Sequence, residues 1–161
     1  MGGWIGFCMA EFASNRLDRL VVGGQHPFAR SMGHLRQMVC AGINGGTDAF
    51  LAAFRQVFGP AEGAFAARLR RADLRAYLAL SQDRVGLDEL LAVISIPCCL
   101  YAGEADDLYE QARIASHQIP GATFFLLPGL DHCEAFSRAD LAIPPVLRFL
   151  QSGGLPTGSA E

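Results

Sequence analysis

Three short apolar runs predict buried strands. They cover residues 19–24, 97–103 and 123–127, and the apolar residues in them follow one another rather than alternate with polar ones. Runs of this kind are typical of strands in parallel sheets that are covered on both faces. Each run ends in or is closely followed by a glycine, namely Gly23, Gly103 and Gly129. The pattern therefore predicts an α/β fold with about three parallel strands that end in tight turns.

Apolar residues at helical spacing predict the helices around this sheet. Ile5, Met9 and Phe12 lie on one stripe of a helix expected over residues 2–12. Glycines are poor helix formers, so those at the start of this helix indicate that another segment packs closely against it. Further helices are expected at residues 29–40, 48–58, 62–71, 73–81, 87–93 and 109–117. The glycines between residues 42 and 46 predict a break between the first two of these helices.

The end of the chain carries two helix signals. Ser137 and Asp140 have the spacing of a capping box, in which a hydroxyl and a carboxylate bond reciprocally to backbone N–H groups. Pro144 predicts the start of the last helix, because proline suits a first helical turn. The residues from 151 onward are rich in glycine and small polar residues, and we expect them to be disordered.

The distribution of strands and helices divides the chain. Residues 1–27 and 94–150 contain all the strands and are expected to form a sheet core. Residues 28–93 lack strand signals and are expected to form a helical cap, because lids are often built as helical insertions between sheet strands. Residues 151–161 form the expected tail.

Composition and charge exclude several classes of function. The net charge is −3 and the 13 basic residues are mostly scattered, so we expect no nucleic-acid partner. No apolar stretch is long enough to cross a bilayer, which argues against a membrane protein. The five cysteines have neither disulfide nor zinc spacing, so we expect no metal or other cofactor and a reducing, cytoplasmic setting.

Candidate chemistry follows the second and third strands. Three acids, Glu104, Asp106 and Asp107, come after Gly103, and His132 comes after Gly129. The carboxyl ends of parallel strands meet at one edge of a sheet, where open α/β sheets place their active sites. We prefer Asp106 as the partner of His132, since it lies at the apex of its loop. Asp107 is then an exposed acid at a helix start, which the helix dipole favours.

These residues resemble the motifs of the α/β-hydrolase family over about residues 1–150. Gly103 to Asp106 is similar to the family's acid loop, and Pro128 to His132 to its histidine loop. The stretch from Met1 to Gly6 is similar to the second half of the nucleophile elbow G-x-S-x-G and its helix. The resemblance implies a partial α/β-hydrolase fold, an esterase-like activity, Asp106 and His132 as acid and base of a catalytic triad, and the backbone nitrogen of Met1 as an oxyanion donor.

In that alignment the nucleophilic serine precedes Met1, so we expect a C-terminal, truncated portion of a hydrolase that is inactive alone. No serine within the chain has a G-x-S-x-G surround. A hydrolase with an aspartate nucleophile, as in epoxide hydrolases and dehalogenases, is an alternative. A second alternative is a non-catalytic fragment or interaction module that uses an exposed sheet edge, through which the chain would self-associate. The substrate of the whole enzyme would be a small molecule.

Overall fold

The computed structural model describes residues 2–59, 61 and 63–152. The chain divides into two compact units. We call residues 1–28 and 87–161 the sheet unit and residues 29–86 the helical unit. Within the described helices, none combines the length and the apolar character that a bilayer span requires.

The sheet unit contains three parallel strands in the order β1-β2-β3. They are β1 (Leu20–Gly23), β2 (Cys98–Gly103) and β3 (Thr123–Leu127). The register pairs Leu20 with Cys98 where β1 begins, and Gly103 with Leu127 where β2 and β3 end. The three-stranded parallel sheet predicted from the apolar runs is thereby confirmed.

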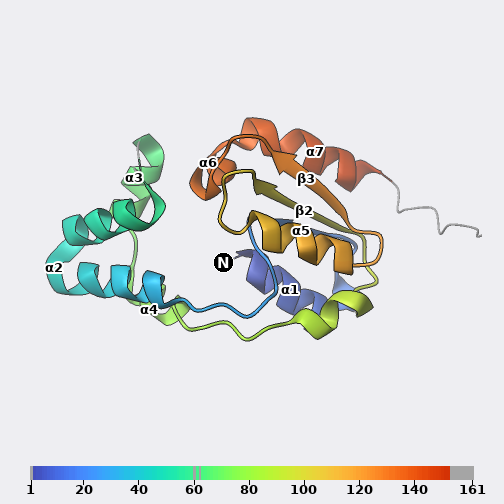
Figure 1. Ribbon diagram of the computed structural model, residues 1–161, viewed down its shortest axis with the longest axis horizontal. Helices are drawn as coiled ribbons and strands as arrows, with labels where there is room; N and C mark the ends of the chain where they lie inside the picture. The colour runs from blue at the N-terminus through green and yellow to red at the C-terminus, as the bar shows by residue number, and fades with distance from the viewer. Residues whose placement is uncertain (1, 60, 62, 153–161) are drawn as a thin grey trace, which may run out of the picture. The chain divides into compact units, whose positions relative to one another are not determined.

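Helices cover both faces of this sheet (Figure 1). The helices α1 (Gly2–Phe12) and α5 (Tyr109–Gln118) and the 3₁₀ helix η2 (Asp88–Val93) pack on one face. The helices α6 (His132–Ser137) and α7 (Ala139–Gln151) pack on the other. Side chains of β2 alternate between the two layers, as the pleat of a strand requires: Cys98 and Leu100 enter the first core, and Tyr101 contacts the second.

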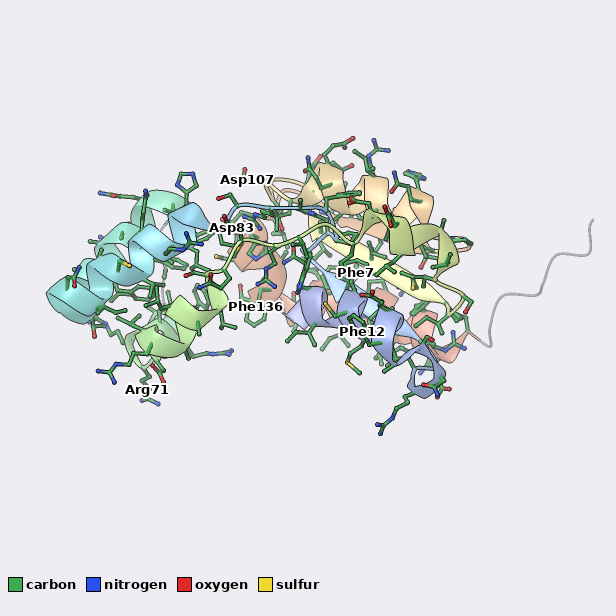
Figure 2. All side chains as sticks on the ribbon, turned by 90° about the horizontal axis from the view of Figure 1, so that it is seen from below. Phe7, Phe12, Arg71, Asp83, Asp107 and Phe136 are labelled. Carbon is green, nitrogen blue, oxygen red and sulfur yellow. The ribbon has the colours of Figure 1, made fainter. Side chains whose placement is uncertain are left out.

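The glycines of α1 let this helix approach β1 closely. A Cβ at Gly3 would lie 2.7 Å from the Cβ of Gln25, and one at Gly6 would lie 3.0 Å from a methyl group of Leu20. The side chain of Phe7 on the same helix is 1% exposed and fills the space above the sheet (Figure 2). Close approach to β1 is therefore the physical reason for glycines in a helix that they weaken.

The helical unit consists of α2 (Gly33–Phe58), α3 (Gly63–Arg70) and α4 (Leu74–Leu80). Gly46 has a positive φ of 80° and kinks α2, which is the break that the glycines predicted. The chain folds back there, so that a Cβ at Gly42 would lie 2.6 Å from the Cβ of Phe50. Phe50 is fully buried and contacts Phe54 and Tyr77, which makes an aromatic core for this unit.

The boundaries of the units differ slightly from the expected ones. The helical unit ends at residue 86, whereas the cap was expected to reach residue 93. Residues 88–93 form η2, whose Leu91 is 1% exposed within the core of the sheet unit. Helix α7 reaches Gln151, the first residue of the expected tail, and residues 153–161 lie outside the described part of the chain.

The predicted start of the last helix is wrong. Helix α7 begins at Ala139, so Pro144 and Pro145 lie inside it. Each proline removes an N–H that would otherwise bond to the carbonyl four residues earlier, at Asp140 and Leu141. Both of those residues are exposed, so water can satisfy the carbonyls. The capping box lies not at Ser137 but at Asp131 and Glu134, where it starts α6.

A cluster of hydrogen bonds closes the ends of the helical unit. Arg30 and Arg84 exchange two backbone hydrogen bonds of 3.0 and 2.8 Å. Beside them, a carboxylate oxygen of Asp83 accepts from the N–H of Met32 at 2.8 Å and from the guanidinium of Arg36 at 3.2 Å. The Met32 N–H, with help from Arg36 and the hydroxyl of Ser31, lowers the pKa of Asp83. We call these six residues the clasp.

We predict that Asp83→Asn loosens the clasp, because a neutral amide accepts a weaker hydrogen bond than a carboxylate does. The measurement is hydrogen exchange at the Met32 and Arg84 amides, which we expect to become faster. Since the folded pKa of Asp83 is lowered, its contribution is present above its unfolded pKa and is lost as the pH falls through the folded one. Asp48→Asn, which removes another exposed ion pair of the same unit, is the control and leaves these amides unchanged.

Candidate active site

Two loops meet at the carboxyl end of the sheet. The acid loop follows β2 at Gly103, and the histidine loop follows β3 at Leu127. The N–H of Glu104 donates to the carbonyl of Leu127 at 3.0 Å, and the N–H of Ala105 donates to the carbonyl of Leu130 at 3.0 Å. These bonds continue the pairing of β2 and β3 beyond the strands. A Cβ at Gly103 would overlap the carbonyl of Leu130, so this strand end requires glycine.

The acid loop holds Asp106 in a fixed position. Its side chain is 1% exposed, and one carboxylate oxygen accepts from the N–H of Leu108 at 2.9 Å. Its backbone N–H donates to the carbonyl of Gly103 at 3.2 Å, and its carbonyl accepts from the N–H of Tyr109 at 2.9 Å. A buried carboxylate is costly unless its oxygens are hydrogen-bonded. The second oxygen of Asp106 therefore also needs a partner.

The histidine loop provides that partner. His132 is the first residue of α6, and a capping box fixes this helix start. The carboxylate of Asp131 accepts from the N–H of Glu134, and the carboxylate of Glu134 accepts from the N–H of Asp131. At this helix start, Nδ1 of His132 lies 2.8 Å from Oδ2 of Asp106. The imidazole is 45% exposed, in contrast to the carboxylate. The structure thus brings together the two residues that the sequence singled out.

The two other acids of the loop have different roles. Asp107 is exposed (Figure 2) and precedes α5, as expected for an acid near a helix start. The carboxylate of Glu104 accepts from the N–H of Gly129 at 2.9 Å and so joins the acid loop to the histidine loop. No local pattern in the sequence indicates this contact, because it joins segments 25 positions apart.

A third strand end touches the pair. Gly24 directly follows β1, is buried, and has a positive φ of 56°. Its N–H donates to the carbonyl of Tyr101 in β2 at 2.7 Å. A Cβ at Gly24 would lie 3.2 Å from Oδ2 of Asp106 and 3.2 Å from both Nδ1 and Cε1 of His132. The lack of a side chain at Gly24 is therefore what allows the imidazole to lie against the end of β1.

Three other candidates have structural explanations or lie outside the structure. His26 is buried in a turn, where its Nδ1 accepts from the N–H of Phe28 at 3.2 Å. Burial, with the charges of Asp131, Asp106 and Glu134, raises the pKa of the Cys133 thiol, which disfavours a nucleophilic thiolate. Met1, the expected oxyanion donor, lies outside the described residues.

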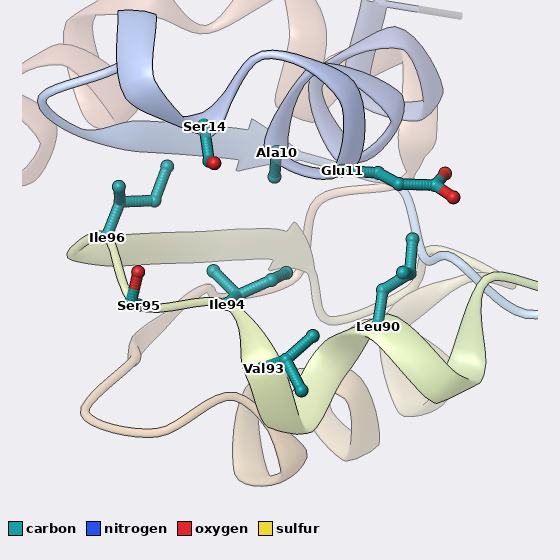
Figure 3. Close-up of a pocket in the computed structure, with 8 residues that line it drawn as sticks. All are labelled: Ala10, Glu11, Ser14, Leu90, Val93, Ile94, Ser95 and Ile96. Atoms are coloured by element: carbon teal, nitrogen blue, oxygen red, sulfur yellow. The ribbon is translucent and has the colours of Figure 1, made fainter.

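Five serine hydroxyls of the described residues are hydrogen-bonded away from His132. Those of Ser81, Ser116, Ser137 and Ser152 donate to backbone carbonyls of their own helical segments, and that of Ser31 bonds to Asp83. Ser14 and Ser95 line a cavity of about 160 Å³ (Figure 3). That cavity lies between the end of α1 and the segment leading into β2, at the opposite end of the strands from His132. Within the described chain, no hydroxyl is hydrogen-bonded to the imidazole.

The described part of the chain contains no set of side chains that could bind a metal ion. No group of three or more His, Cys, Asp or Glu side chains there could hold a metal ion. Cys98 and Cys99 are buried in β2, and burial raises the pKa of the Cys98 thiol to about 12. At the strand ends, Asp106 holds Nδ1 of His132, which leaves Nε2 as the ring nitrogen that a reacting group could use.

Comparison with solved structures identifies the fold. The sequence matches no protein-family profile and no curated protein. The structure is similar to the enol-lactonase from Burkholderia xenovorans LB400, with a TM-score of 0.75 and 20% identity over 93% of this chain and 62% of that one. It is also similar to the esterase RhEst1 from Rhodococcus sp. ECU1013, with a TM-score of 0.72 and 20% identity over 93% of this chain and 62% of that one. A third similar structure is MGS-M2, an α/β hydrolase from a Medee basin deep-sea metagenome library, with a TM-score of 0.75 and 15% identity over 98% of this chain and 65% of that one.

These neighbours are hydrolases, and the chain spans less than two thirds of the length of each of the three. Almost the whole described chain superposes on them, with all three strands parallel. The sequence resemblance to the α/β-hydrolases, drawn from the acid and histidine loops, is therefore confirmed at the level of the fold. The chain has part of the α/β-hydrolase fold.

Proposed function

We propose that this chain supplies the acid and the base of a carboxylic-ester hydrolase whose nucleophile comes from polypeptide outside residues 1–161. The observation that carries the proposal is the 2.8 Å hydrogen bond between the half-exposed His132 and the buried Asp106. An imidazole held by a carboxylate at the carboxyl edge of a parallel sheet is the arrangement that activates a hydroxyl nucleophile.

In this proposal each residue has one role. Asp106 accepts a hydrogen bond from the Nδ1–H group of His132 and so keeps the imidazole in the tautomer whose Nε2 has a free lone pair. His132 takes the proton of the attacking hydroxyl, passes it to the leaving group, and then activates water in the same way. Asp106 stabilises the imidazolium while it is charged. The backbone nitrogen of Met1 is the proposed oxyanion donor of the assembled enzyme.

The position of the pair supports an external nucleophile. The ring atom Cε1 lies beside Gly24 at the end of β1, and Nε2 is bonded to Cε1. A further parallel strand on the outer edge of β1 would end about 4.8 Å beyond it. A serine in the turn after such a strand would reach Nε2. An aspartate nucleophile in the same place, with His132 activating water, is the alternative chemistry.

The names of the structural neighbours support the reaction class. Two of them are called an enol-lactonase and an esterase, and both names describe enzymes that act on carboxylic esters. Their identity to this chain is 20%, so the alcohol and acyl parts of the substrate stay open. We propose a small-molecule ester as the substrate.

We predict that Asp106→Asn reverses the tautomer of His132. The amide keeps an oxygen for the N–H of Leu108 and turns its NH₂ toward Nδ1, which must then accept, so the ring proton moves to Nε2. The ¹⁵N chemical shifts of the imidazole measure this change in the full chain. In the assembled enzyme the same change should lower ester hydrolysis by about 10⁴-fold. Asp107→Asn, at the exposed neighbouring acid, is the control and should change neither the ¹⁵N chemical shifts nor the rate of ester hydrolysis.

We predict that the chain alone hydrolyses p-nitrophenyl acetate no faster than its His132→Ala variant, because no described hydroxyl is bonded to the imidazole. A chimera in which residues 1–161 replace the matched 62% of the Burkholderia enol-lactonase should gain hydrolysis that depends on His132. A His132-dependent burst from the chain alone would place the nucleophile inside it. If a folded chimera were equally active with and without His132→Ala, the chain would be better interpreted as a non-catalytic interaction module.

We predict that Gly24→Ala displaces the imidazole. The new Cβ would press on both partners, and the imidazole must yield because Asp106 is buried and tied to Leu108. The signal of the proton shared between Nδ1 and Asp106 should therefore weaken or shift in the NMR spectrum. Gly129→Ala is the matched control: Gly129 also has a positive φ, of 68°, but a Cβ there meets nothing within 4 Å. Equal effects of the two variants would assign the change to backbone strain instead.

A further inference from the structure

The turn that leads from β3 toward His132 is weakly held by its own contacts. Pro128 and Gly129 are both exposed, and Gly129 has a positive φ of 68°. A proline followed by a glycine of positive φ is typical of a type II turn, which a bond between its first and last residues often closes. Here that bond, from the N–H of Leu130 to the carbonyl of Leu127, is 3.4 Å long and therefore weak. Within the described chain, a Cβ at Gly129 would meet nothing within 4 Å, so packing does not fix the turn there.

Hydrogen bonds to the acid loop hold this turn instead. The N–H groups of Glu104 and Ala105 donate to the carbonyls of Leu127 and Leu130, each at 3.0 Å. A further bond runs from the N–H of Gly129 to the carboxylate of Glu104 at 2.9 Å. A hydrogen bond to a charged acceptor is about twice as strong as one between neutral groups. The bond to Glu104 is thus the strongest of these contacts, and it is the one that a side-chain substitution can remove.

The bond between Glu104 and Gly129 lies close in the chain to both members of the acid–base pair. Asp106 follows Glu104 by two positions, and His132 follows Gly129 by three. Asp131, which caps α6, stands directly before the histidine. The carboxylate of Asp106 is buried and bonded to its own loop, so it cannot follow a displaced imidazole. A movement of the turn at Gly129 therefore changes the distance between Nδ1 of His132 and Oδ2 of Asp106.

We infer that Glu104 is a positioning residue for the proposed acid–base pair. Its carboxylate holds the turn at Gly129 and thereby keeps Nδ1 of His132 within hydrogen-bonding distance of Asp106. The inference rests on the proposed function and deepens it, because it adds a residue on which the orientation of the base depends. Glu104 acts through the turn and not through contact with the reacting atoms. A competing explanation is its negative charge, since a nearby carboxylate also favours the protonated form of an imidazole.

The experiment compares three substitutions of Glu104 in the full chain by NMR. Glu104→Ala removes the bond, so exchange of the Nδ1 proton of His132 with water should become about fivefold faster, as expected for the loss of one ordinary hydrogen bond. Glu104→Gln keeps an acceptor oxygen at the same reach and should leave this exchange rate close to that of the unsubstituted chain. Glu104→Asp keeps the charge but is one methylene shorter, and it should behave like Glu104→Ala. Asp107→Ala, at the exposed acid of the same loop, is the matched control and should leave the rate unchanged.

Exchange of the Gly129 amide proton reports on the bond itself, and it should become faster in Glu104→Ala and Glu104→Asp only. Unchanged amide exchange in these two variants would overturn the inference, as would faster amide exchange with an unaltered Nδ1 proton. If Glu104→Gln or Asp107→Ala matched Glu104→Ala, the charge and not the bond would be the cause, which also overturns it. Should Glu104→Ala not fold, the contrast between Glu104→Gln and Glu104→Asp decides the question alone.

Hydrolysis separates this inference from the proposed function. In the chimera with the Burkholderia enol-lactonase, Glu104→Ala should lower kcat about fivefold and leave KM unchanged, and Glu104→Gln should restore kcat. If kcat were equal in all the Glu104 variants of an active chimera, the positioning role would be wrong and the proposed function would stand. A folded chimera without His132-dependent hydrolysis would overturn the proposed function, whereas the NMR comparison would still show whether Glu104 positions the imidazole.

Discussion

The parallel register of β2 and β3 is the constraint on which the site depends. It pairs Gly103 with Leu127, so both strands end at the same level and their loops begin side by side. The bonds from Glu104 to Leu127 and from Ala105 to Leu130 extend this register into the loops. A slip by one residue would move His132 by about 3.3 Å and would exchange the faces of Phe124 and Phe125 between the two cores. Core packing thus fixes the meeting of acid and base.

The burial of Asp106 accounts for its pairing with His132 from the described residues alone. A carboxylate with 1% exposure must have both oxygens hydrogen-bonded, and the backbone of its own loop satisfies only one of them. His132 completes the set. The fold therefore positions the carboxylate, and the carboxylate positions the imidazole. The cap of α6 and the absence of a side chain at Gly24 also fix where the exposed ring lies.

The sequence was informative where local patterns decide the structure. Uninterrupted apolar runs located the three strands, and glycines after them located the loops, so the acid and the histidine could be placed at one edge. Helix α6 was missed because it has only six residues and its capping pair, Asp131 and Glu134, lies within the histidine loop. The start of α7 was misplaced because proline was taken as a first-turn signal although exposed carbonyls tolerate it inside the helix.

Other features could not be predicted because they depend on contacts between distant segments. Gly24 and His132 are more than one hundred positions apart, and no periodicity relates them. The bond between Glu104 and Gly129 likewise appears only once β2 and β3 are paired. The end of the helical unit at residue 86 follows from the burial of Leu91 in the other core, and a helical stretch does not reveal in which core it will be buried.

The position of His132 links the carboxyl ends of all three strands. His132 follows β3, yet its side chain extends past the end of β2 and its ring lies beside Gly24 at the end of β1. An imidazole so placed lies near the unpaired edge of the sheet rather than at its centre. Within the described residues, the imidazole thus lies at the outermost strand β1, although its loop follows β3 at the other edge of the sheet.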